Sequence, residues 1–414
     1  MTVRRVVVTG TGVCAANGTG VPAFWESLRA GRSGIGPITR FDPAGLCSRI
    51  AGQVDDLDPE TKLGAKIRKR TARFAQLALV AAQEAITEAA WPAAFDREDV
   101  AVVVGSGIGG FDHLEREHQA FVEKGIGRFH PLTVPMIIPN MAAGAIAMET
   151  GCKGPNVCPV TACASGAHAI GEALDLLRDG RAAVAVAGSA ECTISPWAVD
   201  GYCMLRALST RNDSPLTASR PFSATRDGFV IAEGAGIVVL ETLEHAEARG
   251  AAILAEVAGF GMSSDGHHIT APDPSGRGAV RAMRAALADA GLAPGDVQVV
   301  NAHGTSTPLN DATETRAIKE VFGDHAHRLA VHSTKSMIGH SLGGAAGIEA
   351  VVCVLTLRHQ TVHPTINLID PDPECDLDYV PGAARAADVD AVMSNAFGFG
   401  GHNGVLVFRR WPES

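Results

Sequence analysis

The sequence predicts an α/β protein built from two similar halves. Short apolar runs that end at glycine alternate with longer segments of helical periodicity along all 414 residues. Glycine is abundant, at 46 residues, and aromatic residues make up only 5%, a composition that suits helices packed closely on a sheet. Two segments of the first part of the chain also recur in the second. With no linker or low-complexity segment between them, the two halves are expected to pack intimately.

Apolar runs rich in β-branched residues, each closed by a turn, predict the strands. They cover residues 6–9, 100–104, 182–187, 254–257 and 297–300, and residues 227–241 suggest a hairpin or strand pair around Glu233 and Gly234.

Apolar residues at helical spacing predict the helices. In residues 62–90, Phe74, Leu77 and Ala81 share one face, and Trp91 with Pro92 ends the helix. Further helices are predicted over 24–32, 140–148, 245–249 and 278–290, from residue 311, and after Cys163 and His340. Residues 111–138 show no such spacing and are expected to be irregular.

The internal repeat has two parts. EAITEAAWPAAFDREDVAVVVGSGIGG resembles RAALADAGLAPGDVQVVNAHGTSTP, and CASGAHAIGEA from Cys163 resembles HSLGGAAGIEA from His340. In this alignment Cys163 and His340 occupy equivalent helix starts that point at a shared centre. We therefore divide the chain into an N-terminal half, 1–250, and a C-terminal half, 251–414.

Charge and cysteine content limit the function classes. A net charge of −10 argues against non-specific binding to nucleic acid or an anionic membrane, so an acidic partner must meet a local basic patch. Nine cysteines without a CxxC pair suggest neither a disulfide framework nor a zinc site. No uncharged apolar run reaches the length of a membrane span. These features predict a soluble protein of the reducing cytoplasm.

The stretch PVTACASGAHAIGEA places Cys163 at a predicted helix N-terminus. Unpaired N–H groups and the helix dipole there stabilise a thiolate, so we expect a lowered pKa and a nucleophile. A cysteine among small residues can equally be a packing residue.

Two histidines and a lysine favour the interpretation of Cys163 as a nucleophile over that of a packing residue. His303 follows a predicted strand in NAHGTSTP, and His340 precedes a predicted helix in STKSMIGHSLGG, with Lys335 five residues before it. Strand ends and helix starts are the usual places for active sites in α/β proteins. A cysteine with two histidines and a lysine makes a nucleophile with proton-transfer and oxyanion-binding groups.

The motifs TACASG, NAHGTSTPLND, STKSMIGH, HPTINL and NAFGFGG, in this order, closely resemble the elongating β-ketoacyl-acyl-carrier-protein synthases of type II fatty acid synthesis. The resemblance covers essentially the whole chain. It implies a thiolase-like fold, in which duplicated βαβαβαββ halves form a five-layer αβαβα sandwich, and a homodimer. It also implies an acyltransferase that elongates acyl chains by decarboxylative Claisen condensation with malonyl-carrier protein.

The same resemblance assigns roles to residues. Cys163 takes the acyl chain, His303 and His340 stabilise the malonyl enolate as neutral imidazoles, and Lys335 orders their environment, with Glu349 as its candidate partner. The backbone N–H groups of Cys163 and Phe399 form the oxyanion hole, and Phe399 also gates the site. Which histidine acts as a base stays open.

Substrate contacts follow from the resemblance as well. Thr270, Thr305 and Thr307 match positions that bind the phosphopantetheine arm and malonyl group, and Ile108 matches a residue of the acyl pocket. No cofactor is implied, because the carrier protein supplies phosphopantetheine. Of the basic residues that could meet an acidic carrier protein, we select Arg68, Lys69 and Arg206 first.

Four positions depart from the family's pattern: Thr133, Pro159, Tyr202 and His402. They concern the acyl tunnel and the gate, so they leave the chain length, and the role of Tyr202 as a substrate contact, open. A specialised polyketide or polyene pathway is the alternative within the same chemistry. A non-catalytic chain-length partner is disfavoured by Cys163, and a degradative thiolase by the absence of a second cysteine near NAFGFGGHN.

Overall fold

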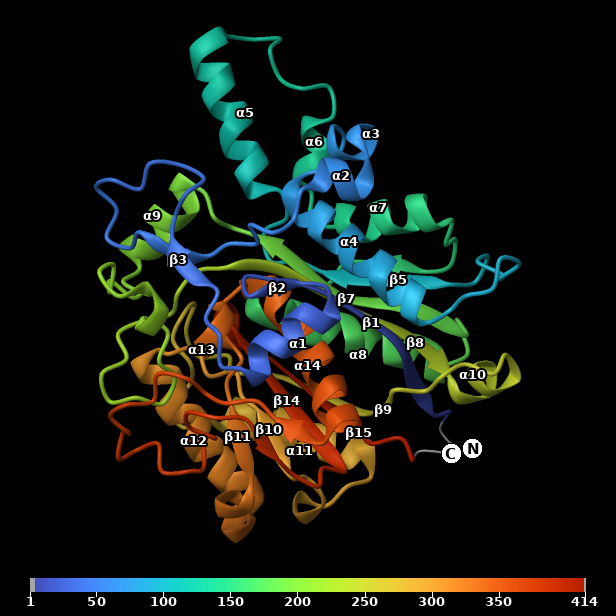
Figure 1. Cartoon of the computed structure of the whole chain (residues 1–414), viewed down its shortest axis with the longest axis vertical. Coiled ribbons are helices and arrows are strands. Elements are labelled where there is room, and N and C mark those ends of the chain that lie inside the picture. The colour runs from blue at the N-terminus through green and yellow to red at the C-terminus, as the bar shows by residue number, and fades with distance from the viewer. Residues whose placement is uncertain (1–3, 413–414) are drawn as a thin grey trace.

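A computed structural model describes residues 4–412, and one large mixed sheet runs through it (Figure 1). Across this sheet the strands follow the order β11, β10, β14, β15, β9, β1, β8, β7, β5 and β6. In that order their bounds are Ala330–His332, Val299–Asn301, Ala391–Gly398, His402–Arg409, Ala255–Ser264, Val6–Ala15, Glu233–Thr242, Val184–Cys192, Ala101–Gly105 and Asn156–Val157. Short strands complete the set: β2 (Gly18–Thr19), β3 (Ile35–Pro37), β4 (Ile50–Gly52), β12 (Thr361–Val362) and β13 (Arg385–Ala386).

Helices cover the sheet in layers. On one outer face, α4 (Arg73–Glu88) and α7 (Met141–Thr150) pack on strands of the N-terminal half, and on the other α11 (Arg277–Ala290) packs on β9 and β15, with α12 (Pro308–Phe322) beside it. Between the halves, α8 (Ser165–Arg178) and α14 (Ala345–His359) contact strands of both (Figure 1). Three buried apolar clusters fill the spaces between these layers. The predicted α/β fold of two packed halves in five layers is confirmed.

The remaining helices lie around this core. They are α1 (Val21–Arg29), α2 (Pro59–Leu63), α3 (Ala65–Arg68), α5 (Phe111–Lys124), α6 (Thr133–Ile137), α9 (Pro196–Met204), α10 (Leu243–Ala248) and α13 (Lys335–Ile338). The division near residue 250 stays a prediction. It falls between α10 and β9, where β1 pairs directly with β9 through Val8 and Ala255.

Glycine lets helices approach the sheet closely, as the composition indicates. A Cβ on Gly12 of β1 would lie 1.9 Å from the carbonyl oxygen of Ala81 in α4, and one on Gly236 of β8 would lie 2.2 Å from the backbone of Gly347 in α14. Both contacts are with backbone atoms, which cannot rotate away. The second contact seats α14, and with it the turn that follows His340, against the sheet.

The internal repeat is present with a different register from the sequence alignment. A 3₁₀ turn, η1 (Ala162–Ala164), leads into α8, and a matching turn, η5 (Leu342–Gly344), leads into α14. Each turn begins with a residue of positive φ, 50° at Ala162 and 49° at Leu342. Cys163 is therefore the counterpart of Gly343, and His340 lies just before the turn rather than at the equivalent helix start. Small residues at the head of both helices made the shifted alignment look equally good.

Two predicted elements are wrong. Residues 111–138 form α5 and α6 rather than an irregular segment, and α5 stands away from the sheet (Figure 1). Residues 227–241 form no hairpin, because Glu233 and Gly234 begin the single long strand β8. Pro159, one of the four departures from the family's pattern, lies outside the strands, since β6 ends at Val157 on the edge of the sheet.

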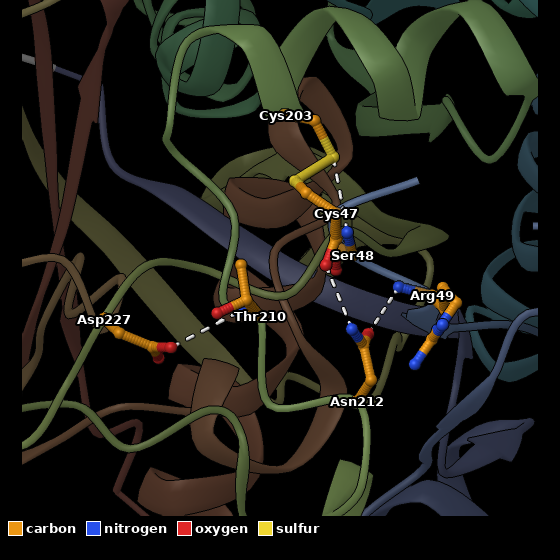
Figure 2. The surroundings of a disulfide bond; sticks show 7 residues. All are labelled: Cys47, Ser48, Arg49, Cys203, Thr210, Asn212 and Asp227. Carbon is orange, nitrogen blue, oxygen red and sulfur yellow. Dashed lines mark hydrogen bonds between the residues drawn. A yellow bond between two sulfur atoms is a disulfide. The ribbon is translucent and has the colours of Figure 1, made fainter. Parts of the chain in front are cut away.

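One pair of cysteines corrects the expectation of unpaired thiols. Cys47 and Cys203 form a disulfide, although 156 residues separate them, and their Cα atoms are 5.9 Å apart (Figure 2). The amide of Ser48 donates to the Cys203 sulfur at 3.4 Å, and Asn212 donates to the Cys47 carbonyl at 3.0 Å. The bond ties the loop after β3 to the C-terminal end of α9. The other cysteines are free thiols: 14, 152, 158, 163, 192, 353 and 375.

One helical segment, Leu342–His359, is long and apolar enough to cross a membrane by length and composition. It is 89% buried inside the protein, as the central helix α14. Its apolar character is explained by packing between the two halves.

We expect Gly12→Ala to lower the free energy of unfolding by about 1–3 kcal/mol, because the added methyl group overlaps the α4 backbone. Chemical denaturation measures this change. Gly201→Ala in α9 is the matched control, because a Cβ there has nothing within 4 Å, and it should stabilise by roughly 0.5–1 kcal/mol. Equal stabilities of the two variants would contradict this account of the β1–α4 contact.

Candidate active site

Cys163 lies where the sequence predicts a nucleophile, at the start of a helix in the centre of the molecule. It is the middle residue of the 3₁₀ turn η1, immediately before α8, and is buried. Gly398 of β14 is tightly placed beside it, since a Cβ on that glycine would lie 3.1 Å from the Cys163 nitrogen. A side chain at 398 would therefore push the loop containing Phe399 away from the sulfur.

Both predicted histidines meet this sulfur. His340 Nε2 lies 3.1 Å from Cys163 Sγ, and the ring centroids of His303 and His340 are 5.3 Å apart at 84°. One side-chain nitrogen of each histidine and the sulfur all lie within 4.8 Å of one another. Residues from the two halves of the chain thus form one cluster, as the motifs predict.

Backbone contacts hold the two histidines in place. His303 follows β10, and its N–H and that of Gly304 donate to the Glu314 carboxylate of α12 at 2.8 and 2.9 Å. The His340 N–H donates to the Val230 carbonyl at 2.7 Å, in a bridge to the segment before β8. Each ring is thereby fixed through its own peptide group, which leaves the side-chain nitrogens free for chemistry.

Lys335 is buried with a single acidic partner. Its Nζ lies 2.5 Å from Glu349 Oε1, and both side chains are 1% exposed. The pair links α13, at the start of the His340 segment, to α14. The expected association of Lys335 with Glu349 is present in the structure.

Burial controls the protonation of the cluster. It lowers the pKa of His303 and of His340 well below the usual value, and the charge of Lys335 lowers both further. Both imidazoles are therefore neutral near pH 7, as the sequence analysis expects.

The expected lowering of the Cys163 pKa is wrong. Burial raises the pKa of this thiol to about 12, although Lys335 and the N–H of Phe399 oppose the rise. The N–H group of Cys163, in the turn before α8, does reach the sulfur, but removal from water has the larger effect. Cys163 therefore needs a base to lose its proton, and His340 Nε2 is within reach.

A pocket with a volume of about 380 Å³ opens onto the cluster. It is lined by five of the other predicted residues: Arg206, Thr270, Thr305, Thr307 and Phe399. The hydroxyls of Thr305 and Thr307 are 2.9 Å apart, and Thr307 also caps α12 through the Asn310 N–H. The backbone N–H of Phe399 points at the Cys163 sulfur, where an oxyanion-hole donor belongs.

Other predicted residues lie outside this pocket. Tyr202 packs edge-on to Phe229, with 5.6 Å between ring centroids, in the apolar cluster that contains Cys163. Ile108 is half-buried in the turn after β5. Arg68 and Lys69 line a separate, charged cleft beside α3, where Arg68 pairs with Glu60 at 2.8 Å. Of the three basic residues selected, only Arg206 lies at the pocket.

Two departures from the family's pattern sit near these features. Thr133 begins α6 and donates to the His130 carbonyl at 2.7 Å. His402 follows the Phe399 turn and lies edge-on to His168, with 6.4 Å between ring centroids.

Sequence reasoning missed two buried carboxylates, Glu314 and Glu191. Each accepts hydrogen bonds from two consecutive backbone N–H groups, Glu314 from the His303 turn and Glu191 from Gly107 and Ile108. Their local signal is weak, because a glutamate on a helix or at a strand end is ordinary in sequence.

Comparison with known families agrees with this geometry. Residues 3–246 match the beta-ketoacyl synthase N-terminal domain, and residues 254–369 match the beta-ketoacyl synthase C-terminal domain. The chain belongs to the beta-ketoacyl synthase family. It is therefore a condensing enzyme of the acyltransferase class, as the motifs predict.

Curated relatives of this β-ketoacyl synthase match over nearly their full length. A 3-oxoacyl-[acyl-carrier-protein] synthase 2 of Synechocystis is 51% identical, covering 99% of this chain and 98% of the relative. The protein of the same name in Coxiella burnetii is 48% identical, covering 98% and 99%.

Solved structures share the fold. The ishigamide ketosynthase/chain length factor superposes with a TM-score of 0.92 at 36% identity, covering 99% of this chain and 100% of the other. A type II PKS ketosynthase in complex with its acyl-carrier protein and bound to the hexaketide has a TM-score of 0.90 at the same identity and coverage. A β-ketoacyl synthase from Burkholderia phymatum also matches, with a TM-score of 0.92 at 36% identity and the same coverage.

Lys335→Met should move the acid limb of the kcat/KM profile to higher pH. Loss of the positive charge raises the pKa of His303 and His340, so both imidazoles protonate, and activity falls, at a higher pH than in the wild type. Steady-state kinetics across the pH range measure this shift.

Glu349→Gln is the matched control, because it breaks the same ion pair and keeps the lysine charge. The acid limb of the kcat/KM profile of this variant should not move to higher pH. An unmoved limb in Lys335→Met would contradict the electrostatic role of Lys335.

Proposed function

We propose that Cys163 carries the acyl chain in this enzyme, which acts as a 3-oxoacyl-[acyl-carrier-protein] synthase and lengthens fatty acyl chains by two carbons. The contact between Cys163 Sγ and His340 Nε2, at 3.1 Å, is the observation that carries the proposal. It pairs a nucleophile with a neutral base in a buried pocket that opens to the surface.

In the first half-reaction the thiol loses its proton to His340, and the sulfur attacks the thioester carbonyl of acyl-carrier protein. A new carbon–sulfur bond forms on Cys163, and the bond to the carrier's phosphopantetheine sulfur breaks. That leaving thiolate takes up the proton. The N–H groups of Cys163 and Phe399 stabilise the oxyanion of the tetrahedral intermediate.

In the second half-reaction malonyl-carrier protein occupies the pocket with its thioester carbonyl against His303 and His340. The bond to the carboxylate breaks, carbon dioxide leaves, and its electron pair forms an enolate. Neutral imidazoles donate hydrogen bonds to the enolate oxygen without protonating its carbon. The carbanion attacks the acyl carbonyl, and the Cys163 sulfur leaves as a thiolate that takes up one proton from water, which restores the thiol. His303, fixed by Glu314, belongs to this step.

The threonines and Phe399 complete the proposal. Thr270, Thr305 and Thr307 line the pocket and offer hydroxyls to the phosphopantetheine arm and malonyl group, while Phe399 gates the passage between the two substrates. No cofactor is needed, because the new carbon–carbon bond takes its electrons from the bond to carbon dioxide. Phosphopantetheine arrives with the carrier protein.

A fatty acyl chain is the favoured substrate over a polyketide. The curated relatives named for 3-oxoacyl-carrier-protein synthesis are up to 51% identical, whereas the type II PKS ketosynthase among the structures is 36% identical, the same value as for the β-ketoacyl synthase from Burkholderia phymatum. A non-catalytic chain-length partner remains disfavoured, since Cys163 and both histidines meet in one site.

Acyl-carrier protein is the proposed macromolecular partner, and Arg206 is its first contact. This exposed residue lies at the pocket that leads to Cys163, so a carrier docked there can deliver its arm. Arg68 and Lys69 extend the basic surface around a neighbouring cleft.

A homodimer in the cytoplasm completes the proposal. Exposed Phe121 of α5 stacks on Phe129 of the loop that follows this helix, with 5.4 Å between ring centroids. Ile126, in the same loop, is 89% exposed. A second copy would cover this apolar surface. Seven of the nine cysteines, Cys163 among them, are free thiols, which suits a reducing compartment, whereas the Cys47–Cys203 disulfide does not.

Cys163→Ala should abolish condensation, because no other group in the cluster can hold the acyl chain. The wild type should release labelled carbon dioxide from malonyl-carrier protein and form a 3-oxoacyl product when an acyl primer is present. Intact-protein mass spectrometry should show the acyl mass on Cys163.

Two further measurements complete this experiment. Cys353→Ala, a buried free thiol of α14, is the matched control and should retain the acyl mass. Treatment with EDTA should leave activity unchanged. Chain elongation by Cys163→Ala would show that the nucleophile is misassigned, and a preference for polyketide primers would favour the alternative pathway.

Arg206→Gln should lower kcat/KM for acyl-carrier protein by roughly three- to tenfold with little change in kcat, because it removes one attraction for an acidic partner. The difference from wild type should shrink as salt is added. Arg284→Gln in α11, at a residue that does not line the pocket, should behave as wild type. Equal effects of both variants at all salt concentrations would rule out docking at Arg206.

A further inference from the structure

A buried carboxylate at the end of β7 joins turns from both halves of the enzyme. Glu191 is 0% exposed. Its Oε2 accepts from the Gly107 N–H at 2.5 Å and the Ile108 N–H at 3.3 Å, and its Oε1 accepts from the Ser106 hydroxyl at 3.1 Å. All three donors belong to the turn after β5, so Glu191 holds that turn by its backbone.

The turn that follows His340 presses on the same carboxylate. A Cβ on Gly343 would lie 2.6 Å from Glu191 Oε2 and 2.3 Å from the Gly107 nitrogen, and the Gly343 N–H also donates to Glu191. A Cβ on Gly107 would likewise lie 2.6 Å from Oε2. The two glycines therefore leave space for one carboxylate between the turns, and that carboxylate accepts hydrogen bonds from both turns.

The bond partners of Glu191 are N–H groups and a hydroxyl rather than a cation. Burial raises the pKa of Glu191 to about 7, and the hydrogen bonds from Gly107, Ser106 and Ile108 oppose the rise. The titratable groups that face it are Cys158, Cys163 and Tyr202, and the negative charge of Glu191 raises the pKa of each. A modest fall in pH near neutrality therefore protonates part of the Glu191 population. A protonated carboxyl group donates a hydrogen bond, whereas the carboxylate only accepts.

The turn after His340 borders the nucleophile. Leu342, next to Gly343, lines the active-site pocket and packs with Cys163 and Phe229 in one apolar cluster. Ile108 is the neighbour of Gly107 on the opposing turn. An acyl chain on the Cys163 sulfur must lie against apolar side chains of this kind, and their separation depends on how closely the two turns meet.

We propose that Glu191 is a positioning residue that locks the Ser106–Ile108 turn against the turn after His340 and thereby sets the length of acyl chain that Cys163 accepts. Glu191 touches no substrate atom and acts through the backbone of the turns. The inference rests on the proposed role of Cys163 as the acyl carrier. It assigns a specificity-determining function to a residue that the sequence motifs do not mark.

The test is Glu191→Gln, which keeps the shape and replaces one acceptor oxygen by an NH₂ donor that faces the N–H groups. The rate of Cys163 acylation is measured by mass spectrometry with butyryl- and dodecanoyl-carrier protein. We expect the ratio of the two rates to change by about tenfold, the effect of one lost buried hydrogen bond. The wild-type ratio should move in the same direction between about pH 8 and about pH 6, as Glu191 protonates, while the variant ratio stays constant.

Glu241→Gln is the matched control. Glu241 is a buried carboxylate of β8 that bonds to Arg249 and Thr9, away from these turns, so its loss should lower the melting temperature without changing the ratio. A ratio unchanged in Glu191→Gln, or changed equally in Glu241→Gln, would overturn the inference. If Glu191→Gln does not fold, Ser106→Ala removes one donor, and an unchanged ratio there is equally decisive. Failure of the wild type to acquire either acyl group on Cys163 would instead overturn the proposed function itself.

Discussion

The exclusion of water from the Cys163–His340–His303 cluster is the constraint on which the site depends. Two helix starts, of α8 and α14, meet in the middle layer of the sandwich and enclose the cluster. Burial keeps both imidazoles neutral, and it also keeps the sulfur protonated until a base takes its proton. In the proposed mechanism, the same dehydration that favours enolate stabilisation by neutral donors makes a base beside the sulfur necessary, and His340 lies 3.1 Å from it.

A fixed architecture of backbone contacts makes this enclosure possible. Gly236 and Gly347 allow α14 to lie against β8 at backbone distance, and Gly398 allows the Phe399 turn to reach the Cys163 nitrogen. A methyl group at any of these positions would separate the layers that bring the catalytic groups together. Glycine content in this enzyme is therefore a requirement of the active site as well as of the fold.

Two buried glutamates play corresponding parts in the two halves. Glu314 holds the His303 turn through consecutive N–H groups, and Glu191 holds the turn after β5 in the same way. A carboxylate offers two acceptor oxygens to neighbouring peptide groups, so it fixes a turn more firmly than a hydroxyl can. Lys335 and Glu349 form a different device, an ion pair whose positive charge acts on the histidines.

The sequence by itself determined the α/β class and the residues of the candidate site: local motifs mark Cys163, both histidines, Lys335 and the Phe399 loop, and periodicity indicates the fold class. Features that depend on long-range proximity were decided only by the tertiary structure. The Cys47–Cys203 bond spans 156 residues, and the repeat register was settled by the positive φ of Ala162 and Leu342. Helix α5 projects from the body, and its buried residues are the polar Asp112, His113 and Glu115, so the usual signal of apolar residues facing a core did not mark it. The sign of the Cys163 pKa shift also needed the fold, because a motif shows which groups are adjacent in sequence but not how much water surrounds them.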